Sequence, residues 1–247
     1  MQLSLTPILL AVELLFLLMM FRNVAGPNPR PSHLRSSNAR MFVYWLWLLA
    51  YSVLVSYLGY RGVYTSEAIL PYLPALWLQS VTVAACVMPV LSSSGLRNDL
   101  RTVVDQTPRS WLIYFHMLRF AALGTMLGAA RGTFPVYFEL LVGVPDLIFA
   151  TSALWVLRKH RAGTLTDRTF LLWNLAGALV IVPITPIVLQ MGLPGPLQYF
   201  TSQPDARAVF SFPMAIAPMI SVPILVLVNL LVVWRLATSA ITQNNSM

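Results

Sequence analysis

The sequence predicts an all-α fold: a polytopic transmembrane helical bundle of about seven spans, with its N-terminus outside and its C-terminus in the cytoplasm. Of the 247 residues, 57% are hydrophobic and 10% are charged, whereas soluble domains carry about 25% charged residues. The apolar residues also gather into stretches that can cross the roughly 30 Å hydrocarbon layer at about 1.5 Å per helical residue. A chain this poor in charge cannot cover itself with a hydrated surface, so we expect membrane lipid to cover it.

Seven apolar stretches use nearly the whole chain, which we treat as one transmembrane domain, residues 1–247. We expect helices, because backbone groups left unpaired in lipid are costly. Barrel strands would alternate in polarity, and these stretches do not. The first stretch has no basic residue ahead of it and contains Glu13, so we interpret it as a retained helix and not as a signal peptide. The expected spans are approximately residues 5–21, 41–60, 69–91, 110–130, 135–157, 169–191 and 211–235, and the longest loops are 22–40, 92–109 and 192–210.

The Lys and Arg residues near the span ends predict the orientation. One side carries twelve of them and the other three, with Arg119 left inside a span. We interpret the net charge of +8 as the topology signal of a multi-pass protein in the inner (plasma) membrane. We expect no nucleic-acid partner, because segment 22–40 has no interleaved aromatic residues. The twelve are Arg22, Arg30, Arg35, Arg40, Arg97, Arg101, Arg109, Arg158, Lys159, Arg161, Arg168 and Arg235, and the three are Arg61, Arg131 and Arg207.

Four ionisable residues fall at membrane depth, where each costs at least about 2.5 kcal/mol and needs a reason. They are Glu13, Arg119, Glu139 and Asp146. The fourth and fifth spans form a hairpin around Thr133, with Arg119 14 residues before it and Asp146 13 residues after it. Both therefore lie roughly 20 Å from the turn. We expect an ion pair between them.

Other polar residues are expected near this pair. Glu139 and Asp146 are two helical turns apart and share a face, and Arg131 is placed to reach Glu139. His116 lies one turn before Arg119. Asn174 and Asn229 are interpreted as amides that bridge helices. The candidate ligand-binding residues are Glu13, His116, Arg119, Glu139, Asp146 and Asn174.

Glycines and prolines are concentrated in the same spans. Gly124, Gly128 and Gly132 form a ridge that allows close helix approach. Pro145 removes the hydrogen bond to the carbonyl of Leu141, and more prolines follow in the sixth and seventh spans. Broken helices beside charges are typical of ion or substrate sites in transporters. We therefore expect a cavity or a moving part here, formed with Pro183, Pro186, Pro213, Pro218 and Pro223.

Several classes of membrane protein are excluded. The only lysine, Lys159, lies in a loop, so no retinal Schiff base is available. Three histidines cannot supply bis-histidine haem ligation in the membrane or a di-iron cluster. The single cysteine, Cys86, excludes a disulfide framework and a CxxC redox pair. The sequence has no P-loop, which excludes ATP-driven chemistry of that type, and no GxSxG motif, which excludes a serine protease of that type. We expect no metal, and the sequence identifies no cofactor.

From the fourth span onward, over residues 111–235, the chain resembles a family of uncharacterised bacterial seven-transmembrane inner-membrane proteins. Two positions depart from the pattern: His116 stands where an Arg is expected, with no Glu beside it, and Asn229 stands where a His is expected. The resemblance implies the fold and the importance of Asp146. The matching residues are Pro145-Asp146-Leu147, Trp173-Asn174, Gly177, Pro194-Gly195-Pro196-Leu197-Gln198, Gln203-Pro204, Phe212-Pro213, Pro218 and Val222-Pro223.

Three functions stay open. The first is a membrane protein whose central polar pocket binds or translocates a small molecule, lipid-soluble ones included. The second is a non-catalytic accessory subunit of a larger membrane complex, with membrane-protein partners and the charges acting only as structural pairs. The third is an intramembrane acid–base enzyme such as a terpene-type cyclase. A pocket that opens onto Asp146 or Glu139 favours binding or catalysis, whereas saturated buried pairs favour a scaffold.

Overall fold

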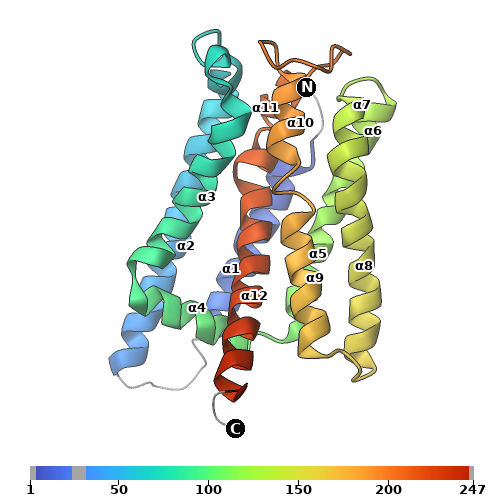
Figure 1. The fold of residues 1–247 in the computed structure, drawn as a ribbon. Helices are drawn as coiled ribbons and strands as arrows, with labels where there is room; N and C mark the ends of the chain where they lie inside the picture. Colours follow the sequence, from blue (N-terminus) through green and yellow to red (C-terminus); the bar gives the residue numbers. More distant parts are fainter. Residues whose placement is uncertain (1–3, 24–31, 245–247) are drawn as a thin grey trace.

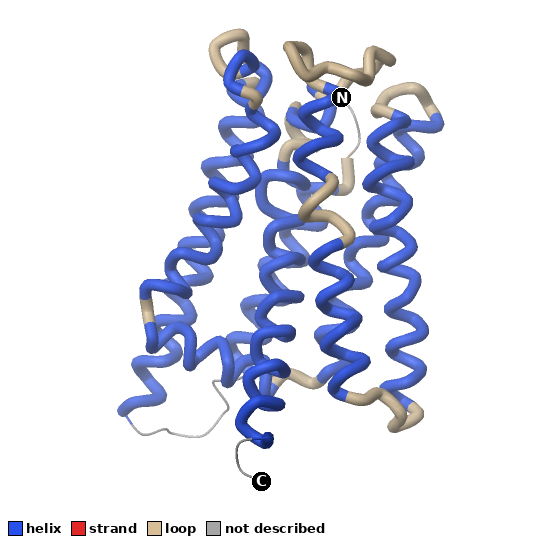
Figure 2. The backbone as a smooth tube through the Cα atoms, in the orientation of Figure 1, coloured by secondary structure: helices blue, strands red, loops and turns tan. Residues whose placement is uncertain are grey.

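The protein is a bundle of helices that run roughly side by side (Figures 1 and 2). This computed structural model describes residues 4–23 and 32–244, with side chains at 4–22 and 37–238, and no strand occurs within those ranges. The first part of the bundle contains α1 (Thr6–Asn23), α2 (Ser32–Tyr60), the short 3₁₀ segments η1 (Val63–Thr65) and η2 (Leu70–Tyr72), α3 (Pro74–Ser92) and α4 (Ser94–Gln106).

The second part contains more and shorter helical pieces. It begins with α5 (Arg109–Met117) and ends with α12 (Val222–Asn244). Helices α9 and α12 pack against each other along much of their length. The pieces in between are η3 (Leu118–Ala121), α6 (Ala122–Ala130), α7 (Val136–Phe138), η4 (Glu139–Gly143), α8 (Val144–Arg161), α9 (Asp167–Leu179), α10 (Thr185–Gly192), α11 (Arg207–Phe210) and η5 (Ala217–Ser221).

Five helices within the described residues are long and apolar enough to cross a membrane. They coincide with the second, third, fourth, fifth and seventh predicted spans. The first predicted span corresponds to α1, and the sixth corresponds to α9 and α10 with a break between them. The last of the five is the central helix, since 67% of its apolar window is buried, against 28–39% in the others. The five are Ser37–Tyr60, Pro74–Ser92, Arg109–Ala130, Val136–Arg161 and Ala217–Thr238.

Two predicted loops contain more helix than expected. Helix α2 begins at Ser32, so the loop assigned to 22–40 is too long; Arg30 and the side chain of Arg35 fall outside the described residues. The loop assigned to 92–109 does connect two candidate spans, but it is mostly helical, because it holds α4, which runs across the bundle (Figure 1). Its N-cap hydroxyl, on Ser93, accepts a hydrogen bond from the amide of Leu96, and its apolar positions are buried every three to four residues.

Four interruptions break the regular α-helix in the second part. Segment η3 is 3₁₀-helical, and η4 and η5 are π-helical. The amide of Val144 donates to the carbonyl of Glu139, five residues back, directly before Pro145, which has no amide hydrogen to donate. Residues 180–184, around Pro183, form the fourth interruption, between α9 and α10. The predicted kinks are thus present as changes of hydrogen-bond register and, at 180–184, as a stretch of turns that bonds from the amides of Val182 and Thr185 to carbonyls four residues back still cross.

Candidate functional site

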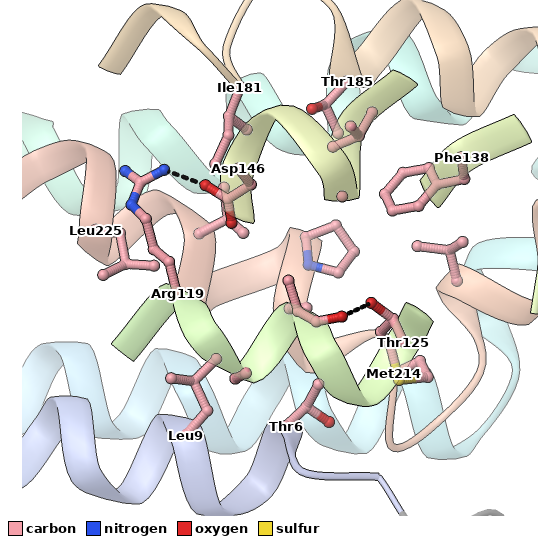
Figure 3. Close-up of a pocket in the computed structure, with 18 of the residues that line it drawn as sticks. Thr6, Leu9, Arg119, Thr125, Phe138, Asp146, Ile181, Thr185, Met214 and Leu225 are labelled. Atoms are coloured by element: carbon pink, nitrogen blue, oxygen red, sulfur yellow. Dashed lines mark hydrogen bonds and ion pairs between the residues drawn. The ribbon is translucent and has the colours of Figure 1, made fainter. Parts of the chain in front are cut away.

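The expected ion pair lies in the interior of the second part. The Nη1 of Arg119 on η3 lies 2.5 Å from the Oδ1 of Asp146 on α8 (Figure 3). Its Nη2 donates to the carbonyl of Gly177 on α9 at 3.0 Å, and the guanidinium lies 4.8 Å from the ring centre of Phe149. The Arg119 side chain has 0% exposure and that of Asp146 has 13%. Arg119 is therefore held by three neighbours, while one edge of Asp146 stays accessible.

A cavity of about 90 Å³ opens beside this pair (Figure 3). Each of the four helix interruptions lines it: η3 through Arg119, η4 through Gly143, the 180–184 break through Ile181, and η5 through Pro218. The wall is mainly apolar. It is completed by Thr6, Leu9, Ala121, Ala122, Thr125, Phe134, Phe138, Val142, Asp146, Thr185, Val209, Met214, Ala217, Val222 and Leu225.

The hydroxyl groups in the wall differ in what they offer to a guest molecule. Thr6 donates to the carbonyl of Pro213 at 2.6 Å and Thr125 donates to that of Ala122 at 2.8 Å. The hydroxyl of Thr185, at the start of α10, and the Nε of Arg119 have no hydrogen-bond partner among the described residues. Both of these atoms are buried, so Asp146, whose side chain keeps 13% exposure, is the polar group of the wall that a molecule in the cavity reaches most directly.

Glu139 lies just behind the cavity wall. Both of its carboxylate oxygens are buried without a hydrogen-bond partner among the described residues. A Cβ added at Gly143 would overlap this carboxylate, so the glycine is what gives it room. Arg131 is exposed and forms no ion pair with Glu139 within the described part of the chain, so that expectation is wrong. The hairpin turn directs Arg131 outward instead.

Glu13, His116 and Asn174 lie in the packed core next to the pair, and they do not line the cavity. Glu13 is fully buried beside Ser221 and within electrostatic reach of Arg119. The ring of His116 packs edge-on against Trp173, with centroids 5.5 Å apart. Of the six candidate residues, only Arg119 and Asp146 reach the cavity. The ligand-binding role of all six stays a prediction.

Of the two asparagines expected to bridge helices, Asn174 interacts with His116 of α5, whereas Asn229 forms no bridging hydrogen bond to a described residue. The Asn174 amide donates to the carbonyl of Phe170 in its own helix at 2.9 Å. Neither amide atom of Asn229 has a hydrogen-bond partner among the described residues. The close approach of helices at this depth is made by Gly177, where an added Cβ would meet the ring of Phe149 and lie 2.9 Å from the Nδ2 of Asn229.

Sequence reasoning overlooked Thr185, Gly143 and the carbonyl of Gly177 as site groups. Thr185 could be found from its place two residues after Pro183 and directly before Pro186, because a break there makes it the first residue of the next helix, beside the cavity. No comparable signal marks the Gly177 carbonyl. No group of three or more His, Cys, Asp or Glu side chains able to hold a metal occurs in the part of the chain that the structure describes.

The ridge of three glycines does not form one continuous seam. Gly124 faces the side chain of Leu5, 3.2 Å from an added Cβ, and Gly128 faces Phe134 in the hairpin turn. Gly132 occupies the turn itself with a φ of +71°, a conformation that favours glycine. Each glycine thus serves a different contact.

Comparison with known proteins gives a family and no function. No curated protein and no solved structure matches the chain. A family model described as a domain of unknown function (DUF8737) matches residues 75–237, which is more than half of the chain and includes the region of the resemblance. Membership of an uncharacterised family is thereby confirmed. The chain belongs to the DUF8737 family.

Proposed function

We propose that this protein crosses the inner membrane seven times and that its central cavity binds or translocates a small, lipid-soluble molecule. The observation that carries this proposal is the meeting of four helix interruptions at one cavity that reaches the Arg119–Asp146 pair. Irregular backbone at membrane depth is tolerated where it is buried in protein or lines a cavity, and π-helical and 3₁₀ segments inside long helices often mark functional positions.

The chemistry of the wall favours a molecule with a hydrogen-bond donor. Arg119 already has two acceptors, Asp146 and the Gly177 carbonyl, so we assign it the task of holding Asp146 in place. The partly exposed carboxylate of Asp146 then accepts from the guest. An engineered dry cavity of about 150 Å³ holds benzene. The cavity here, at about 90 Å³, suits a smaller molecule or the polar end of a longer one.

The proposed topology is supported by the charges and by the ends of the bundle. Helix α1 begins at one end and α12 finishes at the other (Figure 1), as an odd number of crossings requires. In this arrangement α9 and α10 together make the sixth crossing. Single cysteines introduced into a Cys86→Ser background test it. We expect Thr164→Cys to react with an impermeant thiol reagent only from the cytoplasmic side, and Thr201→Cys only from outside. Labelling of both from one side would contradict seven spans.

A matched pair of substitutions on α6 tests the binding proposal. Ala122 lines the cavity, whereas Ala130, on the same helix, is exposed and does not. Native mass spectrometry of mildly extracted wild-type protein should show a bound small molecule. We expect Ala122→Leu to lose it and Ala130→Leu to keep it. Equal retention by the two variants would exclude this cavity as the site.

The accessory-subunit function is the second candidate. It is favoured by the position of Glu13, His116 and Asn174 in the packed core, away from the cavity. In the same measurement, a protein partner in fixed stoichiometry with no small molecule would support it. For the acid–base enzyme, a cyclase included, the cavity supplies only one accessible carboxylate, Asp146.

A further inference from the structure

A second hollow lies far from the central cavity, at the Arg-rich end of the bundle. It is a groove of about 470 Å³ between α2, α3 and α4. Its wall on α2 includes Val43 and Trp47, whose side chains are 63% and 46% exposed. The remaining lining residues are Ala39, Arg40, Tyr44, Pro89, Ser93 and Leu96. All but Arg40 and Ser93 present mainly apolar surface, so the groove suits a hydrocarbon chain.

The polar end of this groove is a built ion pair. Arg40 on α2 directs Nε and Nη2 at the two carboxylate oxygens of Asp99 on α4, at 2.8 and 3.1 Å. Gly95 lies against the same guanidinium, since an added Cβ would be 3.0 Å from its Nε. The Arg40 side chain nevertheless keeps 40% exposure. The guanidinium is thus fixed in direction and still accessible from outside.

The surroundings of Arg40 are positively charged overall. Helix α4 adds Arg97, which donates to the last carbonyls of α3, and Arg101, which lies 4.4 Å from the ring centre of Trp234. Arg235 of α12 pairs with Asp105. With Arg40, four arginines stand against two aspartates here. Because α4 buries its apolar face and runs across the bundle, this end has the character of a membrane–water boundary.

We propose that the groove binds an anionic phospholipid, with an acyl chain along Val43 and Trp47 and the phosphate at Arg40. Basic pockets between membrane helices recognise anionic headgroups, and each arginine near the surface adds about 1 kcal/mol of attraction. A zwitterionic lipid fits the apolar part equally well and gains less from the arginines. Only Arg40 lies at the groove itself, so the preference for anionic over zwitterionic lipid there is about five-fold, which is the 1 kcal/mol of one arginine expressed as a ratio of affinities.

Tryptophan quenching in vesicles tests this assignment on the full chain. Brominated phosphatidylglycerol and brominated phosphatidylcholine are compared at equal mole fraction. We expect phosphatidylglycerol to quench more strongly and Trp47→Phe to remove the excess. Trp45→Phe, a matched change on α2 whose indole bonds to Leu14 instead, should retain it. Equal quenching by the two lipids, or an excess that survives in Trp47→Phe, would overturn the proposal.

The charge at the site is tested by a double variant, because Arg40→Gln alone would leave Asp99 unpaired. Arg40→Gln with Asp99→Asn should lower the five-fold preference to about one, whereas Arg158→Gln, at an exposed arginine elsewhere, should leave it unchanged. Loss of the preference in both variants would mean that general surface charge is responsible. Displacement of the brominated lipid by millimolar inorganic phosphate would assign the site to a soluble anion and overturn the lipid proposal.

Discussion

Helix α2 and the helices of the second part are all apolar, but they differ in how regular their backbones are. Helix α2 runs without interruption for 29 residues, and its sequence contains no proline. The second part has four interruptions: η3 between α5 and α6, η4 directly before α8, the stretch between α9 and α10, and η5 directly before α12. Composition alone does not separate these regions, because all are apolar enough to span a membrane or to form half of a span. Each interrupted segment has a proline or a buried charge at membrane depth, as Arg119, Pro145, Pro183 and Pro218 show, and α2 has neither.

The four helix interruptions are placed around the central cavity, and none lies on α2. A broken helix that faced lipid would leave backbone groups unpaired at a cost of several kcal/mol. All four interruptions instead border one cavity, while α2 has many of its large side chains exposed and none on the central cavity. We infer that the α2 side is a lipid-facing support and that the second part is the region adapted for function.

The largest expected effect comes from breaking the central ion pair. Asp146→Asn leaves the guanidinium of Arg119 buried without a counter-charge, which should lower the free energy of unfolding by about 3–5 kcal/mol. The matched change Asp105→Asn removes the half-exposed pair with Arg235 and should cost less than about 1 kcal/mol. Thermal unfolding in one detergent measures both. Similar losses in the two variants would show that the central pair is not specially buried.

A double variant then separates structure from function. Arg119→Leu with Asp146→Leu removes both charges and should restore most of the lost stability, because a hydrophobic replacement of a buried pair is often neutral. If the wild-type protein carries a bound molecule, we expect the double variant to fold and to lose it. A folded double variant that keeps the molecule would show that the pair is structural only.

A smaller effect is expected at the helix crossing beside the pair. At Gly177 an added Cβ would overlap the Phe149 ring, which itself stacks on Trp173 with centroids 5.0 Å apart. Gly177→Ala should therefore cost about 1–3 kcal/mol by overpacking. Gly124→Ala meets only the flexible end of Leu5 and should cost less than about 1 kcal/mol. Equal melting temperatures of the two variants would contradict tight packing at Gly177.

Hydropathy anticipated the helical class and the existence of most long helices, because length and apolar content are local properties. It missed α4, which is amphipathic and not apolar: Leu96, Leu100 and Val103 occupy one face and Arg97 and Arg101 interrupt the pattern. It also assigned residues 169–191 to one continuous span. Hydropathy does not register the break at 180–184, because the segment stays apolar and only Pro183 marks its place.

The site could be anticipated in part for a related reason. The Arg119–Asp146 pair followed from counting residues on either side of a hairpin, since two charges at one depth have few other partners. Which residues reach the cavity could not be counted in this way. The π-helical turn at 139–143 changes the register between Glu139 and Asp146, so residues seven apart do not line the cavity together. Whether each of the other predicted site residues reaches the cavity depends on how its side chain is oriented in the core.

The smallest expected effect on stability is that of replacing Asn229. This amide is fully buried on α12 and bonds to no described residue, so it contributes no hydrogen bond whose loss would be felt. Asn229→Leu keeps the number and branching of the side-chain heavy atoms and should change the free energy of unfolding by less than about 1 kcal/mol, in the stabilising direction, because the cost of an unpaired buried amide exceeds the cost of fitting the larger leucine. Thermal unfolding beside Val228→Ala, a plain cavity-creating control in the same core, gives the scale. A loss for Asn229→Leu as large as that of the control would mean that the amide is bonded in the membrane, and that the polar core beside Arg119 extends to α12.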